Sequence, residues 1–162
     1  MSDDSECKSA SYWSSNVLST VSNRTGYAQT DFMFVDGDQG RWARVRRETG
    51  SMQTKLDAQN VWNHMKESIN EEGQIIEQLQ LVTYSGGSAY GQGYMEAVSS
   101  EIKAMAEKEG IGFAYGEDNI IEYSVKLAPY QSYSITYPNS GSKNVNVSHY
   151  GDILSGNDAD VT

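Results

Sequence analysis

The sequence predicts an α/β fold, arranged as a three-layer sandwich with a mainly parallel sheet. Apolar runs that are typical of strands alternate with runs of helical period, in the order strand, helix, strand, helix, strand, strand. The 162 residues are enough for one domain with a hydrophobic core and too few for two comfortable ones. We expect a loosely ordered lead-in over 1–28 and one domain over 29–162. In parallel sheets, functional groups collect in the loops that follow the carboxyl ends of strands.

The amino-terminal half contains one expected strand and one expected helix. The polar lead-in has a short element near Trp13–Val21. The apolar run Asp31–Val35 predicts a buried strand, because the turn-forming stretch "DGDQG" follows it. The basic run "RWARVRR" predicts a solvated strand or loop face. Apolar residues near helical spacing predict a helix with one buried stripe, formed by Met52, Leu56, Val61, Trp62, Met65 and Ile69.

The second half supplies the remaining strands and a longer helix. Leu79–Tyr84 and Asn119–Pro129 are predicted strands, the latter ended by its proline. A helix is predicted up to about Lys108, because apolar side chains recur every three or four residues at Tyr90, Tyr94, Met95, Val98, Ile102 and Met105. The segments 132–138 and 143–154 are expected to be extended.

Composition excludes several classes of function. The net charge of −10 is unsuited to a nucleic-acid-binding protein, which needs clustered Lys and Arg. No apolar run approaches the roughly 20 residues of a membrane helix, and no secretory signal is visible at the amino terminus. Cys7 is the single cysteine, so no internal disulfide and no cysteine-based zinc site forms. We expect no metal and no cofactor, and the sequence leaves the cellular location open.

Ser85 lies where a strand passes into a helix, in "TYSGGS". This arrangement resembles a nucleophile elbow, in which small flanking residues let the chain fold back sharply and expose the serine hydroxyl. Thr83 stands where the elbow has its first glycine, and Gly87 satisfies the second small position. Alternatively, the Gly-Gly pair makes an ordinary tight turn in which Ser85 or Ser88 caps the helix. The residues of the turn alone do not separate these two interpretations.

Three stretches in order resemble α/β-hydrolases of the class-3 (fungal-type) lipase group. They are "LQLVTYSGGSAYGQGYMEAV", "EYSVKLAPYQS" and "VNVSHYGDILS", which together span about half the chain. They are also similar to lipase-like segments at the C-terminal ends of bacterial rearrangement-hot-spot (Rhs) repeat proteins. The resemblance implies an incomplete α/β-hydrolase-like core. It places Ser85 as nucleophile, Asp152 as triad acid and the amide of Gly86 in the oxyanion hole, with the loop at Gly37 as candidate for the second oxyanion amide.

The general base is the element that this resemblance does not locate. The family's catalytic histidine follows the acid, whereas this sequence has no histidine after Asp152. The chain is then a fragment whose histidine lies beyond Thr162, or His149 or His64 serves as base, or the domain has kept the fold and lost the reaction. His149, three residues before Asp152, is at a position that is usually structural in the family.

The expected function is therefore ester cleavage by a nucleophilic serine, with a small ester or a lipid as substrate. The alternative is a degenerate, non-catalytic interaction or effector-associated module on the same scaffold. A protein partner or a homo-oligomer fits either function, whereas a nucleic-acid partner fits neither. The acidic loops at 36–38 and 157–160 are expected to be solvated turns rather than calcium sites.

Overall fold

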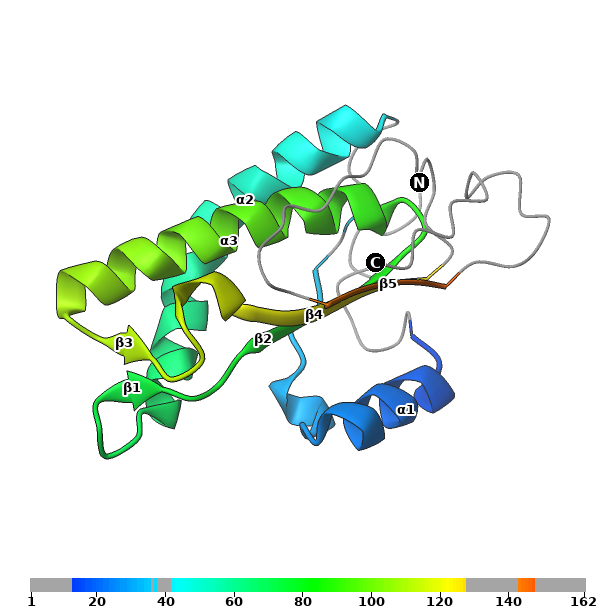
Figure 1. Cartoon of the computed structure of the whole chain (residues 1–162). Coiled ribbons are helices and arrows are strands. Elements are labelled where there is room, and N and C mark those ends of the chain that lie inside the picture. The colour runs from blue at the N-terminus through cyan, green and yellow to red at the C-terminus, as the bar shows by residue number, and fades with distance from the viewer. Residues whose placement is uncertain (1–12, 36, 38–41, 128–142, 148–162) are drawn as a thin grey trace.

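The computed structural model describes residues 13–35, 37, 42–127 and 143–147, and its elements are shown in Figure 1. In chain order they are α1 (Ser15–Thr25), the 3-10 turn η3 (Gln29–Asp31), α2 (Ala43–Met65), η4 (Lys66–Ser68), β1 (Gln74–Ile75), β2 (Leu79–Tyr84), α3 (Gly87–Glu109), β3 (Gly112–Phe113), η5 (Glu117–Asn119), β4 (Ile121–Leu127) and β5 (Lys143–Val147). No helix within these ranges has an apolar stretch that would cross a bilayer.

All strand pairs between these elements are parallel. The larger sheet has the order β2-β4-β5, and Val125 of β4 pairs in register with Val82 on one side and Val145 on the other. The short strands β1 and β3 form a second parallel pair. Helices α2 and α3 lie on one side of the larger sheet and α1 lies on the other (Figure 1). The prediction of a mixed α/β fold with a parallel sheet is confirmed at this level.

Helix α3 follows the predicted pattern and supplies much of the core. Its apolar residues recur every three or four positions, and Tyr90, Tyr94, Val98 and Ile102 are all buried. Gly110 ends the helix at φ 69, a left-handed conformation that glycine adopts without strain. These side chains pack with Trp62 of α2 and with residues of β1, β3 and β4 in one hydrophobic cluster.

Helix α2 corrects two predictions. It begins at Ala43, so residues 43–47 of the run expected as a solvated strand or loop form its first turns. Its buried stripe is also shifted, because Met52 and Leu56 remain 68% and 74% exposed. The buried positions are Gly50, Thr54, Ala58, Trp62 and Met65. Most of these residues are small, and they bring the backbone of α2 close to α3.

The two long helices run in the same direction and touch backbone to backbone. The glycine at position 50 lies against the carbonyl oxygen of Tyr90, and Gly93 lies against the carbonyl oxygen of Arg47. At the far end, the indole Nε1 of Trp62 donates to a carboxylate oxygen of Glu109 at 2.8 Å. The amino-terminal ends of α2 and α3 therefore lie together, at the edge of the sheet where β2 ends (Figure 1).

The amino-terminal region also differs from expectation in one element. The short element expected near Trp13–Val21 is α1, which buries Leu18. The expected strand over Asp31–Val35 is wrong, because residues 32–35 pair with no described strand and Met33 is 54% exposed. The predicted strands near 79–84 and 119–129 are β2 and β4, and β5 covers the start of 143–154. The segment 132–138 lies outside the described residues.

Candidate active site

Ser85 has an unusual backbone conformation. Its φ of 50 is the only positive φ of a non-glycine residue in the described part of the chain. Such a conformation costs an L-residue on the order of 1 kcal/mol or more, and it persists only where surrounding contacts impose it. The residue lies between the last residue of β2 and the first turn of α3, where the sequence predicts an elbow.

Hydrogen bonds hold this turn in place. The amide of Ser85 donates to the carbonyl of Leu127 at 2.9 Å, which extends the ladder between β2 and β4 by one residue. The amide of Ser88 donates to the carbonyl of Ser85 at 3.1 Å. The hydroxyls of Thr83 and Ser88 lie 3.1 Å apart in a buried pair. The hydroxyl of Ser88 is thus hydrogen-bonded to that of Thr83. No described residue hydrogen-bonds the hydroxyl of Ser85.

The turn formed by Ser85, Gly86 and Gly87 is the corner at which β2 passes into α3. Glycines let the helix, the strand and the residue Gly37 approach one another closely at this corner. A Cβ atom added to Gly91 would lie 2.5 Å from Cγ2 of Thr83, so α3 can cross β2 here only without a side chain. A Cβ added to Gly37 would lie 2.8 Å from Cα of Gly87. Gly37, from the loop expected to supply the second oxyanion amide, therefore lies beside Gly87 at the corner.

A basic side chain also reaches the corner. The guanidinium of Arg46, in the first turn of α2, lies against Gly86 and occupies the space that a Cβ there would need. Sequence reasoning missed this contact because it assigned the whole basic run to a solvated face. A basic residue about 40 positions from the turn carries no sequence signal of such proximity.

The strand register relates Ser85 to the predicted acid. Tyr84 is paired with Leu127, and Leu127 is paired with Val147. The three parallel strands thus end level with one another, and the chain leaves β2 and β5 at the same edge of the sheet. His149 and Asp152 follow Val147 by two and five positions, and both lie outside the described residues.

His64 lies near the start of β2, whereas Ser85 follows the end of this strand. The ring nitrogens of His64 lie 3.5 Å from Glu67 and 3.8 Å from Glu77, which precedes β2. The six residues of β2, which lie between Glu77 and Ser85, span roughly 20 Å at about 3.3 Å per residue. This separation excludes His64 as a general base for Ser85 in the described conformation.

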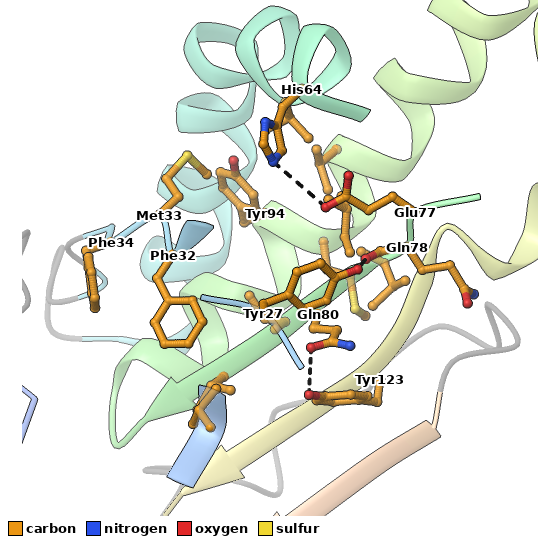
Figure 2. Close-up of a pocket in the computed structure, with 18 of the residues that line it drawn as sticks. Tyr27, Phe32, Met33, Phe34, His64, Glu77, Gln78, Gln80, Tyr94 and Tyr123 are labelled. Carbon is orange, nitrogen blue, oxygen red and sulfur yellow. Dashed lines mark hydrogen bonds and ion pairs between the residues drawn. The ribbon is translucent and has the colours of Figure 1, made fainter. Parts of the chain in front are cut away.

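An apolar pocket of about 520 Å³ lies along β2. Its walls come from α1, the segment 27–34, α2, α3, and the strands β2 and β4 (Figure 2). Polar groups are few, and they include the Tyr123 hydroxyl, which donates to Oε1 of Gln80 at 2.7 Å. Ser85 does not line the pocket, but Trp13 does, and its ring meets that of Tyr84 edge-on at 6.4 Å. The sequence gives no signal for this pocket, because its walls come from six separate segments.

Lys126 is a buried cation on β4, the strand that pairs with β2. It is the register partner of Thr83, and only 6% of the residue is exposed. Burial lowers the pKa of Lys126 from 10.5 to about 8, because the charged ammonium loses water contacts. Among the described residues, no group of three or more His, Cys, Asp or Glu side chains is arranged to hold a metal ion.

No protein-family model, curated protein or solved structure matches this chain. A proposal for its function therefore rests on the sequence motifs and on the geometry around Ser85.

Proposed function

We propose that this protein is a serine hydrolase of the lipase or esterase kind, built on an incomplete α/β-hydrolase-like core, in which Ser85 attacks an ester carbonyl. The observation that carries the proposal is the backbone of Ser85, which has a φ of 50 at the end of β2. A strained serine at a strand-to-helix turn is typical of a nucleophile elbow. The parallel order β2-β4-β5, with α3 directly after β2, supports the same assignment.

The neighbouring groups have roles in the proposed reaction. The Ser85 hydroxyl loses its proton to a histidine as it forms the acyl-enzyme, the alcohol of the ester leaves, and water then releases the acid. The amides of Gly86 and Gly37 are the candidate donors to the oxyanion. Asp152 orients the histidine, and His149 is the imidazole in this sequence that remains a candidate for that position.

The pocket along β2 favours a substrate with an apolar group. Its walls are mainly apolar, and four consecutive residues of β2, 79–82, contribute to it. The same strand delivers Ser85 three residues later. An acyl chain that enters past Trp13 and Tyr84 would bury its hydrocarbon there, at about 0.8 kcal/mol for each buried methylene.

A fluorophosphonate probe tests the proposed nucleophile. We expect the probe to label the wild-type protein and to leave Ser85→Ala unlabelled. Ser14→Ala is the matched control, because Ser14 also lies at the start of a helix but its hydroxyl accepts a hydrogen bond from the amide of Val17. We expect this variant to be labelled like the wild type.

The alternative function is a non-catalytic interaction module, and the distance of His64 from Ser85 favours it. In this case a folded protein would resist the probe and would leave both short-chain and long-chain esters intact. Far-ultraviolet circular dichroism establishes folding in the same samples, so that absence of labelling is not confused with absence of structure.

A further inference from the structure

Val45, Met52 and Leu56 form a second stripe on α2, on the side that faces away from α3, and they are 43%, 68% and 74% exposed. Successive residues of a helix are turned by about 100°, so a residue lies roughly opposite the one two positions further on. The residues two positions after Met52 and Leu56 are Thr54 and Ala58, and both are buried. The hydroxyl of Thr54 donates to a backbone carbonyl of α3 at 3.2 Å. The packing of α2 on α3 therefore leaves the apolar stripe exposed.

The exposed stripe has the spacing by which helices pair with one another. Its residues alternate at intervals of four, three and four, in the order Val45, Thr49, Met52 and Leu56. This alternation is that of the a and d positions in a coiled coil. Trp42, the N-cap of α2, is 62% exposed and precedes Val45 by three residues, so the pattern extends over two heptads. A contiguous apolar stripe of this length is unusual on a monomer, and its period indicates that the partner is a helix.

The charges beside the stripe favour a second copy of α2 in the antiparallel direction. Glu48 and Lys55 are both exposed and are seven residues apart, so they lie on the same flank of the stripe. In an antiparallel pair that packs a positions against d positions, Glu48 of each copy lies within one turn of Lys55 of the other. Two equivalent ion pairs result. In a parallel pair, the same flank would meet Gln53 and Asn60, which are neutral.

We propose that this protein forms a symmetric dimer in which the exposed stripe of α2 packs antiparallel against the same stripe of a second copy. The contact is isologous, so each ion pair between Glu48 and Lys55 occurs twice. The dimer buries Val45, Met52 and Leu56, which water surrounds in the monomer. One helix from each subunit makes a small interface, so we expect a dissociation constant on the order of 1–100 μM. The proposal is independent of any reaction at Ser85.

A mixture of two charge-reversed variants tests the antiparallel register, with sedimentation equilibrium as the measurement. Glu48→Lys and Lys55→Glu each place like charges across the interface, so each variant alone should dimerise roughly tenfold more weakly than the wild type. A heterodimer of the two variants regains both ion pairs, so the equimolar mixture should return close to the wild-type dissociation constant. Glu107→Lys makes the same change of charge at an exposed position of α3 and should leave the dimer unchanged.

A second variant, Leu56→Gln, tests the apolar stripe. Leu56 is 74% exposed, so this substitution should preserve folding and weaken the dimer roughly tenfold. Met52→Gln repeats the test at a second exposed position, and far-ultraviolet circular dichroism checks the folding of every variant. A wild-type protein that stays monomeric above the expected dissociation constant would overturn the proposal, as would a dimer that is unchanged in Leu56→Gln and Met52→Gln. Weakening by both charge reversals without recovery in the mixture would contradict the antiparallel register.

Discussion

Two serines lie at the starts of helices, and their backbones differ. Ser14 precedes α1 with an extended backbone, φ −63 and ψ 147, and its hydroxyl accepts a hydrogen bond from the amide of Val17 at 3.3 Å. Ser85 precedes α3 with φ 50, and no described residue hydrogen-bonds its hydroxyl. Ser14 satisfies a helix end that would otherwise lack a partner. Ser85 lies one residue before Gly86, the N-cap of α3, and its hydroxyl does not cap the helix.

The difference has its origin in the surrounding residues. Ser14 is followed by Ser15 and Asn16, and its contact is local, with the amide of Val17. Ser85 is followed by two glycines that lie against Arg46 and Gly37 from distant parts of the chain. The turn at Ser85 is tied to the end of β4 through Leu127. Packing of the sheet, α2 and α3 around one corner thus imposes the conformation that local preference disfavours.

The largest expected effect comes from breaking the close approach of α3 to β2. Gly91→Val would force the new side chain into Cγ2 of Thr83 and separate the helix from the strand. We therefore expect the free energy of unfolding to fall by about 3 kcal/mol. Urea denaturation measures this loss. Gly112→Ala is the control, since its added Cβ would meet the nearest atom at 3.8 Å, and its effect should stay within about 0.5 kcal/mol. Equal losses would contradict close packing at Gly91.

Lys126, beside the corner, predicts a dependence of stability on pH. The pKa of Lys126 is lowered to about 8, so between about pH 8 and 10.5 the unfolded chain binds more protons than the folded protein. The free energy of unfolding of the wild type, relative to Lys126→Met, should therefore rise with pH, by on the order of 1–3 kcal/mol from about pH 7 to 10. Denaturant titrations of both proteins test this, and a constant difference would refute the burial of the charge.

The smallest expected effects compare the two serines directly, and they have opposite signs. Ser14→Ala should lower the free energy of unfolding by about 1 kcal/mol, because the first turn of α1 loses its cap. Ser85→Gly should raise it by about 0.5–1 kcal/mol, because glycine adopts a positive φ without strain, although its freedom in the unfolded chain offsets part of the gain. Thermal and urea unfolding are precise enough for both. A loss of stability in both variants would show that Ser85 is structural.

The elements around the corner were the part of the fold that the sequence predicted well. The strand Leu79–Tyr84, the following helix and the strand ending near Leu127 were all visible, because their apolar spacing and their glycine and proline boundaries agree. Parallel pairing followed from their alternation. The assignment of Ser85 to a strand-to-helix turn needed no tertiary information.

The remaining features depend on contacts between distant segments. The stripe of α2 was misplaced because the helix buries small and polar residues such as Gly50 and Thr54 and exposes Met52 and Leu56. The run 31–35 is apolar because part of it lines the pocket with Phe32 and Phe34, not because it pairs in a sheet. The contact of Arg46 with Gly86 arises from helix packing, which charge patterning does not reveal.

The most direct test of the account maps the site of fluorophosphonate attachment by mass spectrometry. The wild-type protein contains both Ser14, which caps a helix, and Ser85, which has a positive φ. One digest therefore compares the peptides with Ser14 and Ser85 under identical conditions. We predict that the phosphonyl group is found on Ser85 and not on Ser14. A folded protein with no label on Ser85, or with equal label on both serines, would contradict the assignment of Ser85 as a nucleophile.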